Sequence, residues 1–215
     1  QRGVQVRVIV DGLNGFLHLQ NSSVLRALAA EENVEVKFYD PIDLLRPWKL
    51  NYRLHDKYLI ADGDKYLLGG RNSYDLFLGS YQENQNIDRD MLVVSDGEEG
   101  SSVTQLLTYF DSVWSQPEDQ TIAGRTSDKT DALRERYASL HEMYPESFAA
   151  VDWEAETTAV TRVSLLSGSP RAEAKAPELW DALVHLMAQG DDVLLQTPYI
   201  ICNDKMYGNL EAIAE

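Results

Sequence analysis

The stretch that decides the fold reads HDKYLIADGDKYLLGGRN and runs from residue 55 to residue 72. Two short apolar and aromatic runs, residues 58–61 and 66–68, stand on either side of Asp62, Gly63 and Asp64. Aspartate and glycine tolerate the backbone of a tight turn, whereas the flanking residue types favour strands. The stretch therefore predicts a β-hairpin.

Outward from the hairpin, short strands and helices alternate along the chain. Apolar and polar residues alternate in two places before the hairpin, which is typical of strands with one buried face. Apolar residues at helical spacing follow Ser22 or Ser23, and again follow Ser101 and Ser102, which can cap helices. This order predicts an α/β fold, with a mixed β-sheet flanked by helices on both faces. The expected elements are strands 4–10, 34–39, 58–61, 66–68 and 91–94, and helices ending at Ala30 and Trp114.

The composition changes after Trp114, where a polar stretch with Pro117 and Gly124 predicts a linker. An amphipathic helix is expected to follow, with Pro145 ending it. We divide the chain into a first unit, residues 1–115, a linker with this helix, residues 116–156, and a second unit, residues 157–215. In the second unit we expect strands 160–166 and 192–197, and helices 176–189 and from about 204 to the end.

His55 and Lys57 are two residues apart and therefore share one face of a strand. A two-residue turn, either Gly63-Asp64 or Asp62-Gly63, would bring His55, Lys57, Gly70 and Asn72 to that same face. Directly opposed side chains would then lie about 5 Å apart. A three-residue turn without a bulge would break this parity.

That face would suit a phosphodiester. An ammonium and an amide can hold the non-bridging oxygens and offset the charge that develops in the transition state. The imidazole can attack phosphorus and form a phosphohistidine, which divides one difficult displacement into two. Such an imidazole needs one nitrogen held by a hydrogen bond, ideally to a carboxylate. Asp90 is the candidate for that role, with Asp88 as the second choice.

Residues 55–62 fit the pattern H-x-K-x-x-x-x-D, and residues 69–72 fit G-G-x-N. With these two elements the chain resembles the phospholipase D superfamily, whose HKD motif has this form. The resemblance implies that His55 is the nucleophile or a general acid and base, that Lys57, Gly70 and Asn72 bind phosphate, and that Asp90 orients His55. Asp62 is the aspartate of the HKD motif, but it lies at the corner of the hairpin. We therefore expect it to stabilise the turn and not to take part in the reaction.

Members of this superfamily build one active site from two HKD motifs, and this chain contains one. His18, His141 and His185 are not followed by lysine two residues later. Residues 192–199 resemble the strand and T-P-Y turn that open a second phospholipase D repeat. We therefore expect residues 1–115 to be most of one repeat and 157–215 the opening of another, in a chain cut at both ends. Among two-repeat members it resembles bacterial cardiolipin synthase-like proteins.

The amino-acid composition limits the kinds of partner that the protein can bind. The 19 basic and 35 acidic residues give a formal net charge of −16, which repels phosphate backbones and argues against nucleic acid. The single Cys202 excludes an internal disulfide and a cysteine-built zinc site. No metal or cofactor is expected. No run of 18 apolar residues appears, so no segment is predicted to span a membrane.

The expected function is that of a phosphodiesterase or phosphatidyltransferase acting on phospholipids through a phosphohistidine. A metal-independent nuclease of the same superfamily and an inert half-site remain alternatives. The expected partners are a phospholipid, a membrane surface contacted peripherally, and a second HKD half from a further segment or a homodimer. Two alternatives stay open for Trp48, Tyr52 and Arg53. Their side chains line a pocket for a lipid or a base, or they only pack against one another within their loop. The resemblance implies a bacterial protein, cytoplasmic or membrane-associated, with no anchor in this chain.

Overall fold

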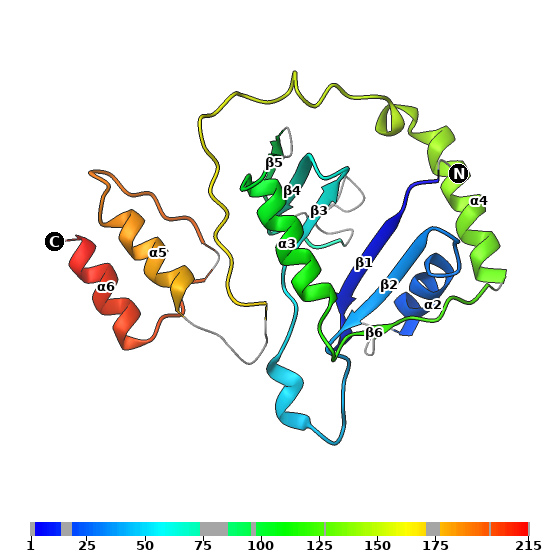
Figure 1. The fold of residues 1–215 in the computed structure, drawn as a ribbon, viewed down its shortest axis with the longest axis horizontal. Helices are drawn as coiled ribbons and strands as arrows, with labels where there is room; N and C mark the ends of the chain where they lie inside the picture. Colours follow the sequence, from blue (N-terminus) through cyan, green and yellow to red (C-terminus); the bar gives the residue numbers. More distant parts are fainter. Residues whose placement is uncertain are drawn as a thin grey trace. The chain divides into compact units, whose positions relative to one another are not determined.

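The computed structural model describes residues 3–13, 19–73, 86–95, 98–126, 128–170, 177–197 and 199–214 (Figure 1). The chain forms two compact units, Gln1–Leu165 and Leu166–Glu215. Both HKD-motif elements, His55–Asp62 and Gly69–Asn72, lie in the first unit.

One sheet of the first unit follows the strand pattern of the sequence. β1 (Val6–Asp11) and β2 (Val34–Tyr39) pair in parallel, with α2 (Leu19–Leu28) between them along the chain. The short β6 (Gln120–Thr121) pairs antiparallel with β2. The sheet is therefore mixed, and its two parallel strands end side by side at Asp11 and Tyr39.

The hairpin forms a second, antiparallel sheet. Its strands are β3 (Tyr58–Ala61), β4 (Lys65–Gly69) and β5 (Asp90–Val94), in that order. One face packs on a helix through a core of four buried residues, which are Tyr66, Val93, Val103 and Leu106. Burial of these apolar side chains is the main favourable contribution that holds the hairpin in place.

Helix α3 (Ser102–Trp114) contacts both sheets. It begins where Ser101 accepts a hydrogen bond from the Thr104 amide, which confirms the expected N-terminal cap. Its first half contributes Val103 and Leu106 to the core of the hairpin sheet. Its second half meets β1, where Arg7 pairs with Asp111 at 2.7 Å and stacks over Phe110. The two sheets are thus joined through one helix.

The remaining elements are helical. In the first unit, the 3-10 helix η1 (Pro47–Asn51) precedes the hairpin, and α4 (Asp128–Met143) is followed by the 3-10 helix η2 (Pro145–Phe148). The second unit contains α5 (Glu178–Met187) and α6 (Asp204–Ala214), joined by a hydrogen bond from Trp180 Nε1 to Asn209 Oδ1 at 3.2 Å. No described helix is both long enough and apolar enough to cross a bilayer.

The expected α/β class with a mixed sheet is confirmed, but two expected strands are absent. Residues 160–166 and 192–197 have no strand pairing among the described parts of the chain. Val163 and Leu165 still pack against the hairpin core. The alternation of apolar and polar residues in this segment therefore reflects burial of one side of an extended chain, and not pairing with another strand. A strand also needs a neighbouring backbone to accept its hydrogen bonds, and apolar alternation alone does not supply one. Conversely, β6 lies within the expected polar linker.

Candidate functional site

The hairpin turn determines which residues face one another, and it is longer than either expected turn. Asp62 and Gly63 both have positive φ angles, of 54° and 77°. The Asp64 amide donates to the Ala61 carbonyl at 3.3 Å. The loop therefore contains three residues, 62–64, and Ala61 pairs with Lys65.

This register corrects the expected parity. The ladder continues one step beyond the strands, where the Gly69 amide donates to the Lys57 carbonyl at 3.2 Å. Lys57 therefore lies opposite Gly69, not opposite Gly70. A shift of one residue exchanges the two faces of a strand, so the ladder does not bring Gly70 and Asn72 to the face of Lys57. The grouping of Asn72 with His55 stays a prediction that rests on the motif.

His55 and Lys57 differ in their surroundings. The His55 side chain is exposed, and no hydrogen bond to its imidazole occurs within the described ranges. Lys57 is half-buried, and its ammonium donates to the His55 carbonyl. Burial lowers the pKa of Lys57, while the charges of Asp56 and Asp88 act in the opposite direction. The site thus presents an accessible imidazole beside a partly desolvated cation.

The two glycines of G-G-x-N make room for two carboxylates. Gly69 pairs with Asp90 across the sheet, and a Cβ atom at Gly69 would lie 1.9 Å from Asp90 Oδ1. A Cβ atom at Gly70 would lie 2.9 Å from Asp88 Oδ1. The distance at Gly69 is far shorter than a van der Waals contact between carbon and oxygen, and the distance at Gly70 is slightly shorter, so a larger residue at either position would displace the facing carboxylate.

The structure pairs Asp90 with Arg71 and not with His55. Arg71 Nε donates to Asp90 Oδ2 at 2.6 Å, and Arg71 Nη2 donates to the Asp88 carbonyl at 3.1 Å. Arginine holds carboxylates in this directed way because its guanidinium is planar and always charged. The expected hydrogen bond from His55 to Asp90 is absent among the residues that the structure describes. The carboxylate partner of His55 therefore stays a prediction.

Asn72 and Asp56 complete the motif region. Asn72 is exposed, and within the described part of the chain it makes no hydrogen bond to His55 or Lys57. Asp56 accepts a hydrogen bond from the Tyr109 hydroxyl at 2.6 Å. Burial, together with this hydrogen bond and the charge of Asp56, raises the pKa of Tyr109. Helix α3 thus fixes the residue between His55 and Lys57.

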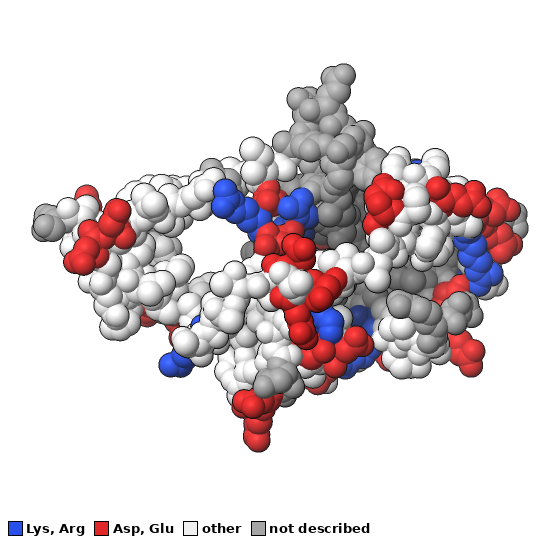
Figure 2. Space-filling model, turned by 90° about the horizontal axis from the view of Figure 1, so that it is seen from above, with Lys and Arg blue, Asp and Glu red and all other residues white. Residues whose placement is uncertain are grey.

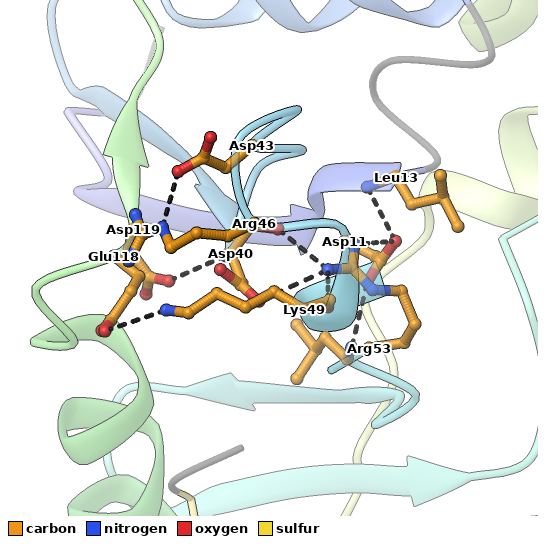
Figure 3. Close-up of polar contacts among 10 residues, drawn as sticks. Asp11, Leu13, Asp40, Asp43, Arg46, Lys49, Arg53, Glu118 and Asp119 are labelled. Atoms are coloured by element: carbon orange, nitrogen blue, oxygen red, sulfur yellow. Dashed lines mark hydrogen bonds and ion pairs between the residues drawn. The ribbon is translucent and has the colours of Figure 1, made fainter. Parts of the chain in front are cut away.

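A buried charged network holds the backbone that leads into His55 (Figure 3). Asp11, at the end of β1, accepts hydrogen bonds from the Leu13 and Leu54 amides, each at 3.0 Å. Arg53 lies between two carboxylates, 3.5 Å from Asp11 and 3.4 Å from Asp40. Residues 53 and 54 are therefore tied to the ends of both parallel strands, directly before His55.

The same network continues toward β6. Asp119 Oδ1 accepts a hydrogen bond from the Asp40 amide at 3.2 Å, and Lys49 pairs with Glu118 at 3.4 Å. Burial raises the pKa of Asp119 to about 6 and also raises the pKa of Asp40. These carboxylates are therefore held in surroundings that penalise their charge.

Sequence reasoning missed this network, although part of it carries a visible signal. Asp11 and Asp40 each stand at the end of an expected strand, and the carboxyl ends of neighbouring parallel strands meet at one sheet edge. For Arg53 the sequence predicts only a role in lining a pocket or in packing within its loop. Nothing in the sequence around Asp119 predicts its contact with Asp40, because the whole of α3 lies between the two residues along the chain.

The α/β fold and the hairpin that bears H-x-K and G-G-x-N define a phospholipase D-like protein. The family described as "Cardiolipin synthase, PLD-like domain" matches residues 1–114, and the chain belongs to that family. This match covers the first unit up to the end of α3, which includes His55, the hairpin and the part of the charged network formed by Asp11, Asp40, Lys49 and Arg53.

Two relatives extend this similarity. "Cardiolipin synthase C" of Escherichia coli strain K12 is 33% identical over 105 residues, which cover 44% of this chain and 21% of the relative. "Cardiolipin synthase" of Oceanobacillus iheyensis is 25% identical over 206 residues, which cover 95% of this chain and 36% of the relative. The chain thus spans about a third of these relatives or less. No solved structure matches significantly.

Proposed function

We propose that this chain supplies one half of the active site of a phospholipid phosphodiesterase or phosphatidyltransferase, similar to cardiolipin synthase. The observation that carries the proposal is the accessible His55 imidazole beside the half-buried Lys57 ammonium, within an H-x-K hairpin of this family. An exposed imidazole can reach a substrate and act as a nucleophile, and a nearby desolvated cation attracts a phosphate.

The proposed reaction has two displacements. A ring nitrogen of His55 attacks phosphorus, the N–P bond forms, and the bond from phosphorus to the leaving alcohol breaks. A general acid gives the leaving oxygen its proton. An acceptor alcohol, or water, then loses its proton to the same group and attacks phosphorus, and the N–P bond breaks. Lys57 offsets the negative charge on the non-bridging oxygens in both steps, with Asn72 as the proposed second donor.

The general acid and base is proposed to come from a second HKD motif. The described chain offers one H-x-K sequence, and His141 and His185 lie on α4 and α5 without a lysine two residues later. A further segment of the protein or a second copy of the chain would supply the partner histidine. Hydrolysis and transfer then differ only in whether water or an alcohol reaches the phosphohistidine.

The test is turnover of phosphatidylglycerol by the full-length protein and by its His55→Ala variant. We expect the variant to lose turnover by about a thousandfold or more, because removal of a nucleophile leaves only binding and charge stabilisation. His141→Ala is the matched control, since that histidine stacks on Phe148, away from the hairpin. Turnover that survives in His55→Ala would end the proposal.

A metal-independent nuclease has less support. The formal net charge is −16, and Figure 2 shows acidic side chains spread over the face in view, with basic side chains in small separate groups. DNA cleavage by the full-length protein in the presence of a chelator, without turnover of phospholipid, would favour the nuclease. Activity of the isolated chain on bis-p-nitrophenyl phosphate would argue against an inert half-site.

A further inference from the structure

The H-x-K segment has a rear side, which faces α3. Along β3, Tyr58 and Ile60 pack against the core of the hairpin sheet, whereas Leu59 between them is 61% exposed. Side chains of an extended chain alternate between two faces. Asp56 therefore lies on the side of α3, and the histidine and lysine of the motif lie on the opposite side.

Tyr109 of α3 contacts both neighbours of Lys57. Its hydroxyl donates a hydrogen bond to Asp56 Oδ2 at 2.6 Å, and its ring meets the ring of Tyr58 edge to face, with centroids 6.4 Å apart. The Tyr109 ring also packs against the hairpin core, so the hydroxyl is carried on a fixed support. A hydrogen bond from a hydroxyl to a carboxylate is among the stronger ones in proteins. One side chain thus holds the residues directly before and directly after Lys57.

The carboxylate of Asp56 also acts on Lys57 through its charge. Burial lowers the pKa of the Lys57 ammonium, whereas the charges of Asp56, on the same segment, and of Asp88, before β5, raise it. Burial and the hydrogen bond to Asp56 raise the pKa of Tyr109, so its hydroxyl stays protonated and remains a donor at alkaline pH. The contact from α3 and the charge on Asp56 are therefore both kept while Lys57 titrates.

We propose that Tyr109 and Asp56 are positioning residues, which hold the H-x-K segment from its rear side so that His55 and Lys57 reach the same phosphate group. The charge of Asp56 at the same time favours the ammonium form of Lys57. A displacement of about 1 Å in a catalytic group can lower a rate by about a hundredfold, so a contact behind the segment affects turnover without touching the substrate. The inference rests on the proposed function, because it assigns no reaction of its own.

Turnover of phosphatidylglycerol by the full-length protein tests the pair. Tyr109→Phe keeps the ring and removes the hydroxyl, and Asp56→Ala removes the acceptor. We expect each to lower kcat/KM by about tenfold or more. The double variant should be no slower than the slower single variant, since both changes remove the same hydrogen bond. Unchanged turnover in Tyr109→Phe, or losses that multiply in the double variant, would overturn the inference.

The pH profile of kcat/KM separates positioning from a purely structural role. In the proposed reaction Lys57 acts as a cation, so activity falls at the alkaline pH where it loses its proton. Asp56→Asn keeps an oxygen that can accept the hydrogen bond but removes the charge, so this alkaline limb should move to lower pH. Tyr109→Phe keeps the charge and should leave the limb in place. A limb that does not move in Asp56→Asn would contradict the assigned role of Asp56.

Two further variants complete the test. Tyr137→Phe is the matched control, because Tyr137 lies on α4 with its ring edge to face with that of Phe148, and it should turn over like the wild type. Urea denaturation shows that each variant is folded at the pH of the assay. If His55→Ala loses turnover while Tyr109→Phe keeps it, only the positioning inference fails. If His55→Ala keeps turnover, the proposed function itself fails.

Discussion

Arg53 is the residue on which the position of His55 depends most. Its guanidinium lies between the buried carboxylates of Asp11 and Asp40, and Asp11 also holds the Leu54 amide, one residue before His55. Two buried carboxylates without a cation between them would repel each other in surroundings of low dielectric constant. Arg53 therefore both neutralises the strand ends and positions the segment that carries the proposed nucleophile.

Replacing Arg53 with alanine should reduce the free energy of unfolding by about 3 kcal/mol, because breaking a buried ion pair leaves uncompensated charge. Urea denaturation at pH 7 measures the change. Arg53→Lys should recover part of the loss, since the charge returns without the bidentate geometry. In contrast, Arg46→Ala should have a much smaller effect on the free energy of unfolding, because its pair with Asp43 is exposed and screened by water. Equal effects of Arg53→Ala and Arg46→Ala would contradict this ranking.

At the scale of elements, the number of residues in one turn decides the face on which each later residue lies. The sequence correctly indicates the two strands and the Asp-Gly corner between them, because these follow from local preferences. It does not distinguish a two-residue from a three-residue turn. Both fit Asp62-Gly63-Asp64, and the choice depends on how β4 pairs with β5 and packs on α3. The parity of Gly70 and Asn72 could therefore not be derived from sequence.

The junction of β2 and β6 predicts a pH-dependent stability. Burial raises the pKa of Asp119 from 3.8 to about 6, so the folded state holds this proton more tightly than the unfolded state. Below about pH 3 both states are protonated and no penalty exists. As pH rises from about 3 to 6 the unfolded state releases the proton first, so stability falls, and the full penalty is present above about pH 6.

Asp119→Asn should therefore be more stable than the wild type at pH 7.5, by about 1–2 kcal/mol, and nearly equal to it at about pH 3. Asparagine keeps an oxygen that can accept the hydrogen bond from the Asp40 amide. Urea denaturation at several pH values measures the difference between the two proteins. A difference that does not change with pH would show that Asp119 is not the titrating group.

For the whole molecule, the residue at which the first folded unit ends can be tested. Val163 and Leu165 pack against the core of the hairpin sheet from an extended segment that has no strand partner in the described structure. A chain that ends at Leu165 should unfold with the urea midpoint of the first unit in the intact chain. A chain that ends at Thr157 should lose about 1–2 kcal/mol, because two half-buried apolar side chains are removed. Equal midpoints for the two truncated chains would place this segment outside the folded unit.

The sequence by itself determined the α/β class, the hairpin, the capped helix after Ser101 and the H-x-K and G-G-x-N elements. Each depends on residues close together in the chain, whose spacing and backbone preferences act locally. Only the tertiary structure decided the hairpin register, the pairing of Asp90 with Arg71, and the approach of Asp11, Asp40 and Asp119 around the loop before His55. These contacts join segments separated by tens of residues, and their energies depend on burial and direction, which a linear pattern does not contain.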